Sequence, residues 1–319
     1  MLQILNKNIF IQWILFLSLF SLSIFIIINH SQMGNGEGVS FLFTAFSNFF
    51  SHHQYFGKGI IIFVLFIQIV LLQYYFSKNE FSGKFSLLPS CFYITILLLA
   101  KSLHNIQPFF FTSLFLLSIL AIRYDISAIK LKNNAFWVGT LIAFATCFDQ
   151  SAIILFIIAI FILFINQFSR LKEIGILLMG FLLIYFYFFS YYFLINQHCE
   201  WFVSFQQLKF FGFLNNENPV GLVFQIKLGC LFIVYLYFLI RTRLISESKV
   251  VMLRKRVITL NFFSILLLGC LILSNSTFPQ LFGYLFLPIT IYLGYLSQEK
   301  NPLYINEIVS ILTLVVLCL

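Results

Sequence analysis

Charged residues are scarce in this sequence. Asp, Glu, Lys and Arg make up only 9% of its 319 residues, whereas 61% are hydrophobic and 20% are aromatic. Soluble domains carry about 25% charged residues, and a chain with so few charges cannot cover a globule of this size with a water-compatible surface. The composition therefore excludes an ordinary soluble protein and indicates an integral membrane protein.

The sequence also lacks long polar stretches and cofactor motifs. The longest segment between apolar runs holds about 28 residues, fewer than the roughly 40 to 50 that an independent domain needs. There is no GxxxxGKS/T, no GxGxxG, no HExxH and no paired CxxC, the motifs that mark phosphate, dinucleotide and zinc sites. We expect no cofactor, no dedicated metal site and no nucleotide-driven transport by this chain. Its six scattered cysteines predict no disulfide framework.

Apolar runs of about 17 to 22 residues recur along the whole chain. At about 1.5 Å of rise per residue, such a run forms a helix that crosses a hydrocarbon core of roughly 30 Å. We expect an all-α fold, a polytopic transmembrane helical bundle that forms a single domain over residues 1–319. Eleven spans are expected at about residues 10–29, 59–76, 85–101, 106–122, 135–148, 150–166, 174–195, 220–240, 257–274, 280–297 and 303–319.

The net charge of +9 is explained by where the basic residues lie along the chain. With the N-terminus inside, 15 of the 19 Lys and Arg residues fall on the cytoplasmic side, and only Lys58, Lys101 and Lys209 fall outside. This distribution follows the positive-inside rule, so it indicates orientation in a bilayer and not binding to nucleic acid. We expect the N-terminus inside and the C-terminus outside, a polar outer loop at residues 196–219 and a basic cytoplasmic loop at residues 241–256.

Two unusual features are expected between the spans. In the outer loop at residues 30–57, the segment 39–50 is too short to span, and its apolar side chains predict an interfacial or re-entrant helix. Spans 135–148 and 150–166 meet at Asp149 without a loop, and a helix of 14 residues reaches only about 21 Å. These two spans predict a helical hairpin whose tip stops below the outer surface.

Charged side chains within spans are costly and are candidate functional residues. Asp149 lies at the tip of the hairpin, Lys227 lies about 10 Å below the outer end of its span, and Glu307 lies near the inner end of the last span. Asp149 and Lys227 share the outer half of the bilayer, where they could pair or face one water-filled cavity. Alternatively, Lys227 extends to the outer headgroups, and Glu307 is an ordinary residue of the inner interface.

A second group of candidates lies in the first outer loop. Glu37 could act as a general base toward a substrate hydroxyl, and His52 or His53 could bind a metal ion or a phosphate. The glycines around Glu37 would let the backbone approach a ligand. The alternative is that these residues belong to a solvated loop, which the weakness of an adjacent His-His pair as a site signal favours.

Aromatic side chains are concentrated near the outer end of the seventh span and in the loop that follows it. Tyr185, Tyr187, Tyr191 and Tyr192 could stack on sugars or prenyl chains, or they could form an aromatic belt at the membrane interface. Trp201 belongs to the polar outer loop, which is rich in Gln, Asn and Glu. That composition suits contact with a carbohydrate or a partner protein.

Several stretches carry a family resemblance. They are residues 77–84 (SKNEFSGK) followed by LLP at 87–89, residues 114–127, residues 134–164, and the region of Pro288 and Asn306-Glu307. These stretches resemble an uncharacterised polytopic inner-membrane family of Bacteroidota with chains of about this length. The resemblance covers most of the chain. It implies a multi-pass protein of the bacterial inner membrane and implies no activity.

The order of elements is similar, more distantly, to that of a second class. Glu37 lies in an outer first loop before the expected interfacial helix, Ala121-Ile122-Arg123 and Ser127 lie on the cytoplasmic side, and the short hairpin lies near Gly139. This order resembles GT-C type membrane glycosyltransferases and bacterial polysaccharide polymerases, which use polyprenyl-phosphate-linked sugars. The resemblance implies that Glu37 is the acidic catalytic residue of the first outer loop.

Three functional hypotheses follow. In the first, the chain is a non-catalytic subunit of an envelope-biogenesis or secretion complex, and its interfacial helix and polar outer loop bind a partner protein. In the second, it is a transferase or polymerase acting on polyprenyl-linked glycans, with Glu37 as base, a Lys or His toward the phosphate and tyrosines against the acceptor or lipid. In the third, it is a transporter, and the intramembrane charges carry its function.

Overall fold

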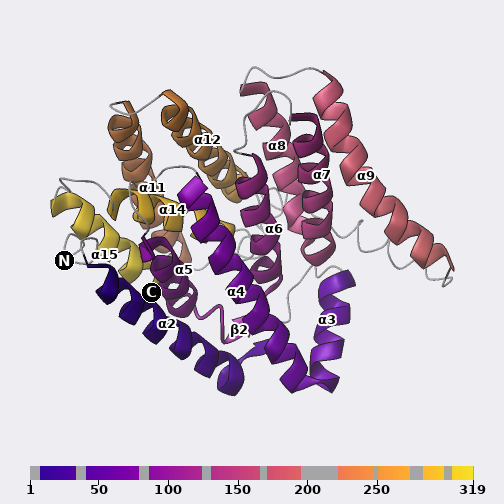
Figure 1. Ribbon diagram of the computed structural model, residues 1–319, viewed down its shortest axis with the longest axis horizontal. Coiled ribbons are helices and arrows are strands. Elements are labelled where there is room, and N and C mark those ends of the chain that lie inside the picture. Colours follow the sequence, from indigo (N-terminus) through magenta and orange to yellow (C-terminus); the bar gives the residue numbers. More distant parts are fainter. Residues whose placement is uncertain are drawn as a thin grey trace.

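The computed structural model describes residues 8–33, 41–78, 86–123, 131–165, 171–194, 222–247, 251–273, 283–297 and 304–318 (Figure 1). Within these ranges the chain forms twelve α-helices, one short 3-10 helix and two strands of two residues each. The expected all-α class is confirmed.

Each of the eleven expected spans coincides with a helix. These helices are α2 (Ile9–His30), α4 (Gln54–Lys78), α5 (Leu88–Leu99), α6 (Pro108–Arg123), α7 (Leu131–Phe148), α8 (Ile154–Ile165), α9 (Leu171–Leu194), α11 (Leu222–Glu247), α12 (Val251–Leu273), α14 (Phe286–Ser297) and α15 (Tyr304–Cys318). In addition, α3 (Phe41–His52) precedes α4, and the 3-10 helix η1 (Gln150–Ile153) joins α7 to α8. Among the described residues, three segments are long and apolar enough to cross a membrane: Ile9–His30, Gln54–Lys78 and Leu171–Tyr191. These segments agree with the membrane association that the composition indicates.

Local sequence explains how two of the helices begin. The side chain of Asn8 accepts a hydrogen bond of 3.1 Å from the backbone N–H of Phe10 and caps α2. Pro89 lies in the first turn of α5, where a helix does not need the N–H that proline lacks. Both helices are otherwise apolar on most sides, which suits a chain whose surroundings are lipid and apolar protein.

α14 lies at the centre of the bundle. All twelve of its residues are buried, and it packs against α5, α11 and α15. Gly294 of α14 lies against Phe76 of α4 and Pro89 of α5, and the contact leaves no room for a β-carbon. Figure 1 shows α7, α8 and α9 on one side of the molecule and α11, α12 and α15 on the other, with α4, α5 and α6 between them. α14 is therefore enclosed by other helices.

A short parallel pairing, which the sequence pattern does not predict, ties two connecting segments together. β1 (Gln32–Met33) follows α2, and β2 (Asn105–Ile106) precedes α6. The backbone N–H of Gln32 also donates to the carbonyl oxygen of His104 at 2.8 Å. Two residues are too few to show the alternation by which a strand is recognised in a sequence. We call this end of the bundle, formed by residues 30–33 and 100–107, the β-bridge end.

α3 occupies the segment that predicts a short helix between the first two spans, although its bounds differ from the expected 39–50. Phe43 and Phe50 are buried, and Phe46 packs edge-on against Phe111 of α6 with ring centroids 4.9 Å apart. On the other side of the helix, Asn48 is exposed. α3 thus packs one face on the bundle, and its location at a membrane interface stays a prediction.

Some helices extend beyond the expected boundaries. α11 reaches Glu247 and α12 begins at Val251, so the segment 241–256, expected to be a basic loop, is mostly helical. α4 already begins at Gln54, so the outer loop expected at 30–57 ends earlier than predicted. Hydropathy marks where side chains leave apolar surroundings, whereas Arg, Lys and Gln are good helix formers that continue a helix into water.

Candidate functional site

The expected hairpin between α7 and α8 is present and is centred on Asp149. α7 ends at Phe148, and η1 begins at Gln150. The N–H of Asp149 donates to the carbonyl oxygen of Ala145 at 2.9 Å, and the carbonyl oxygen of Asp149 accepts from the N–H of Ala152 at 3.0 Å. These bonds fix the backbone of Asp149 between the last turn of α7 and η1, so its side chain has a defined direction.

The carboxylate of Asp149 is buried next to hydroxyl groups from two other elements. Tyr284, in the segment before α14, donates to Oδ2 of Asp149 at 2.7 Å, and Thr112 of α6 donates to Oη of Tyr284 at 2.9 Å. Oγ1 of Thr112 also lies 3.0 Å from the carbonyl oxygen of Phe109. Asp149 is 1% exposed, and Thr112 and Tyr284 are fully buried. We call these three side chains the Asp149 cluster; they join α6, the α7–η1 turn and the segment before α14.

The surroundings of Asp149 disfavour a bare negative charge. Burial removes water from the carboxylate. Asp149 lies between the C-terminal end of α7 and the N-terminal end of η1, so the two helix ends act on its charge in opposite directions. The hydrogen bond from Tyr284 offsets part of this penalty. A buried carboxylate within a bundle of apolar helices is a candidate functional group.

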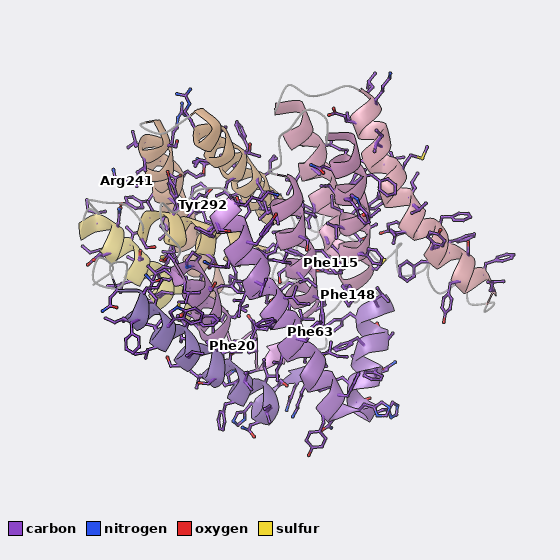
Figure 2. All side chains as sticks on the ribbon, in the orientation of Figure 1. Phe20, Phe63, Phe115, Phe148, Arg241 and Tyr292 are labelled. Carbon is purple, nitrogen blue, oxygen red and sulfur yellow. The ribbon has the colours of Figure 1, made fainter. Side chains whose placement is uncertain are left out.

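Aromatic rings pack beside the Asp149 cluster. Phe148 stacks on Phe111 with ring centroids 5.2 Å apart, and its ring centroid lies 5.8 Å from that of Phe115. Figure 2 shows Phe115 and Phe148 next to each other, between α6 and α7. Because Phe111 also contacts Phe46, these rings give α3, α6 and α7 a shared apolar contact next to Asp149.

Neither of the other two charges expected within spans is shown next to Asp149. Lys227 lies in α11, but its side chain is outside the described residues, so pairing with Asp149 stays a prediction. Glu307 lies in the first turn of α15 and is half-buried. Its neighbour Asn306 is buried and accepts a hydrogen bond from the hydroxyl of Tyr237 on α11. Because a carboxylate in the first turn is favoured by the helix dipole, the position of Glu307 has a local structural explanation.

The candidates of the first and fourth outer segments are only partly described. Glu37 and Trp201 lie outside the described residues, as does the whole polar loop at 196–219. His52 and His53 are exposed at the end of α3. The ring centroid of His53 lies 5.1 Å from that of Phe49, whose carbonyl oxygen also accepts the backbone N–H of His53 at 2.9 Å.

The tyrosines of α9 face in different directions. Tyr185 is half-buried and donates a hydrogen bond of 2.6 Å to Oγ1 of Thr146 on α7, so it belongs to a contact between helices. Tyr187 and Tyr191 are 63% and 54% exposed. The side chain of Tyr192 lies outside the described residues. Of the four expected contact residues, the structure therefore shows two on the surface of the molecule.

A second buried polar group, in the C-terminal half, is not predicted by the sequence pattern. Tyr292 of α14 donates to Oδ1 of Asn261 at 2.9 Å, and its hydroxyl lies 2.5 Å from that of Ser264, also on α12. Thr242 of α11 donates to the same oxygen of Asn261 at 3.4 Å. Figure 2 shows Tyr292 in the part of the molecule that holds α11, α12 and α14. The group joins three helices by neutral hydrogen bonds.

A third polar group joins α4, α5 and α6. Gln68 donates to Oγ of Ser113 at 3.0 Å and accepts from the hydroxyl of Tyr93 at 3.0 Å, and all three side chains are buried. In the sequence, each of these residues is a single polar side chain within an apolar run. Such residues are common in membrane helices, and their partners depend on how the helices pack.

Among the described residues, no three His, Cys, Asp or Glu side chains lie close enough together to hold a metal ion. Cys91, Cys147 and Cys230, which lie in the described part of the chain, are not in disulfides. No family model, no characterised protein and no solved structure matches the chain.

Proposed function

We propose that this chain is a multi-pass protein of the bacterial inner membrane and a non-catalytic subunit of an envelope-biogenesis or secretion complex. In this proposal all eleven helices that coincide with expected spans cross the membrane, with the N-terminus inside and the C-terminus outside. The excess of Lys and Arg in the cytoplasmic segments supports this topology. The β-bridge end then faces the outside, because α2 begins inside and ends there.

The inner-facing half of α9 is fixed to the bundle by a close contact with α7. Gly139 of α7 lies against the backbone of Leu177, and Gly180 of α9 lies against the backbone of Phe136, so neither position has room for a β-carbon. Small residues allow this close approach of two membrane helices. Tyr185 adds its hydrogen bond to α7. The inner-facing half of α9 is therefore held against α7.

The outer half of α9 is the observation that carries the proposal. Phe186, Tyr187, Tyr191 and Phe193 are 66%, 63%, 54% and 61% exposed. Figure 1 shows this end of α9 extending away from the other helices. Rigid aromatic side chains, some with a hydroxyl, are enriched where proteins bind one another. A helix held firmly at one half and presenting aromatic residues at the other is suited to dock a partner protein in the membrane.

Photo-crosslinking in native membranes tests this proposal. A photoreactive phenylalanine analogue placed at Tyr187 or Tyr191 is expected to crosslink to one partner protein in the cell envelope. The same analogue at Phe63 of α4, which is 62% exposed and is labelled in Figure 2, is the matched control and is expected to crosslink to lipid. The double variant Tyr187→Ala, Tyr191→Ala should lose the partner in gentle-detergent purification while keeping its protein level.

Two results would contradict the subunit proposal. Crosslinks to lipid alone from both α9 positions would make the aromatic residues an interfacial belt. Crosslinks only between copies of this chain would indicate a homo-oligomer and not a subunit of a mixed complex.

A lipid-linked glycan transferase or polymerase is the second candidate, and α3 is the observation that favours it. α3 is a short helix directly after the segment that contains Glu37, and it packs on the bundle through Phe43, Phe46 and Phe50. This is the element order of the GT-C type enzymes that the sequence resembles. In this candidate function Glu37 is the base, and His52, His53 or Lys227 contacts the phosphate.

Glu37→Gln separates the two candidates. If the chain is a transferase, this variant abolishes the glycan phenotype at normal protein level, because glutamine cannot accept the proton. Glu200→Gln, which changes another carboxylate expected outside, is the control and should leave the phenotype intact. An unchanged phenotype in Glu37→Gln removes the only candidate base and leaves the subunit proposal.

A further inference from the structure

Four basic residues belong to the β-bridge end or contact it, apart from the Asp149 cluster. The rings of His30 and His104 stack with centroids 6.1 Å apart. Nζ of Lys58, at the start of α4, donates to the carbonyl oxygen of Ile28 at 2.6 Å, two residues before His30 in the last turn of α2. The backbone N–H of His104 donates to the carbonyl oxygen of Lys101 at 3.1 Å. We call these four residues the basic cluster; it brings together α2, α4 and the α5–α6 connection.

Lys101 occupies a backbone conformation that a lysine rarely adopts. Its φ is 54°, the only positive value for a non-glycine residue in the described ranges. The N–H of Ser102 donates to the carbonyl oxygen of Leu97, and that of Lys101 donates to the carbonyl oxygen of Leu98, both at 3.0 Å. This pattern is a Schellman motif, in which the position of Lys101 is usually glycine because a β-carbon there is strained. Lysine at this position does not stabilise the backbone conformation, and backbone strain of this kind is typical of functional positions.

His104 also has an unused polar atom. Its Nδ1 is buried, and no hydrogen-bond partner for it is found within the described part of the chain. His30 and Lys101 are exposed. The acidic residues within the described ranges are Asp149, Glu173, Glu247 and Glu307, and none belongs to the segments that form the cluster. The cluster therefore combines exposed basic side chains with a buried imidazole nitrogen for which no hydrogen-bond partner is found among the described residues.

The two lysines of the basic cluster are unusual in the expected membrane topology. Lys58 and Lys101 are two of the three Lys and Arg residues expected in outer segments. Because the positive-inside rule depletes outer segments of Lys and Arg, those that remain there do not serve orientation. Next to the cluster, Phe25 and Ile28 of α2 are 58% and 46% exposed, and the ring of Phe25 lies 6.4 Å from that of His30. A positive site at the end of an apolar helix face matches a lipid with an anionic head and a hydrocarbon chain.

We propose that His30, Lys58, Lys101 and His104 bind the phosphate headgroup of a membrane lipid, with its chain along Phe25 and Ile28. Lysine ammonium groups bind phosphate as point charges, and imidazole nitrogens donate hydrogen bonds to its oxygens. The lipid class is one with an accessible phosphate, whether a glycerophospholipid or a polyprenyl phosphate. This inference stands independently of the docking role of α9.

Titration of the full-length protein in a neutral detergent tests the inference. The probe is dioctanoyl phosphatidic acid, compared with dioctanoylglycerol, which has the same chains without phosphate, and with inorganic phosphate. Lys101→Gly and Lys58→Gln are each expected to weaken binding of phosphatidic acid about tenfold, the effect of removing one charged hydrogen-bond donor. Lys172→Gln, which changes an exposed lysine at the start of α9, is the matched control and should bind unchanged.

Lys101→Gly keeps the test falsifiable, because glycine suits the positive φ and should leave the thermal midpoint equal or higher. If that midpoint falls, Lys101→Asn, which also tolerates this backbone conformation, replaces it. Equal binding of dioctanoylglycerol would overturn the role of the phosphate. Equal binding of inorganic phosphate would overturn the role of the lipid chain, and unchanged binding by both lysine variants would overturn the site.

Discussion

Asp149 illustrates how much of a polar site can be inferred from a membrane protein sequence. A charge within apolar runs is rare and easily recognised, so the residue itself could be predicted. Its hydrogen-bond partners could not, because Tyr284 lies 135 positions away along the chain, and Thr112 lies 172 positions from Tyr284. Tyrosine and threonine are also frequent in apolar helices, where they bury most of their surface and need only one partner. The members of such a cluster come together only when the helices pack, and the residue types along the sequence do not indicate which helices pack together.

Removing the hydroxyl of Tyr284 tests whether it stabilises the buried carboxylate. Tyr284→Phe should lower the free energy of unfolding by about 1.5 to 3 kcal/mol, because Asp149 loses a charge-directed hydrogen bond while staying buried. Asp149→Asn should cost less, since its side-chain oxygen still accepts from Tyr284 and the buried charge is gone. Denaturant unfolding in detergent measures both, with Tyr187→Phe as a control at an exposed position.

A larger loss in Asp149→Asn than in Tyr284→Phe would contradict this account. It would show that the negative charge is itself stabilised by a positive group, and Lys227 would be the first candidate for a double-mutant cycle.

At the scale of the helix, the sequence predicts which helices exist and in what order. It does not predict the residue at which each helix ends or which helices contact one another. The runs that predict spans coincide with helices because hydropathy reports apolar surroundings directly. Helix ends such as Glu247 depend on backbone hydrogen bonds that continue in water, so hydropathy misplaces them. The contact of Gly139 with α9, and of Gly180 with α7, is reciprocal in space. In the sequence neither glycine belongs to a GxxxG pattern, so that pattern could not predict the contact.

Two glycines of the same helix provide a matched test of the α7–α9 contact. Gly180→Ala places a β-carbon into the backbone of Phe136 and should destabilise the protein by about 1 to 3 kcal/mol through overpacking. Gly175→Ala, on the same helix, meets nothing within 4 Å and should be neutral or stabilising by up to about 1 kcal/mol. Unfolding midpoints of the two variants in one detergent give the comparison. Equal effects of the two substitutions would mean that α7 and α9 do not approach closely in the membrane.

The way the helices enclose one another explains why only some of them are as long and as apolar as a membrane span. α5 and α14 have twelve residues each, which reach about 18 Å, and α14 is buried along its entire length. A helix enclosed by protein need not match the bilayer thickness, because its ends can meet irregular backbone that neighbouring helices shield. Composition could not predict the central place of α14, since lipid and protein interior are both apolar and select the same side chains.

The topology proposed for the whole chain can be decided at its last helix. α15 has fifteen residues, about 22 Å of helix, and it is the element that separates an inside from an outside C-terminus. A fluorescent protein fused after Lys300 should be bright, and alkaline phosphatase fused at the same position should be inactive, because residue 300 is expected on the cytoplasmic side. The same two reporters after Leu319 should give the reverse pattern. If both fusion points give the inside pattern, α15 lies along the membrane, its exposed Ile308 and Ile311 enter the inner interface, and the chain has an even number of spans.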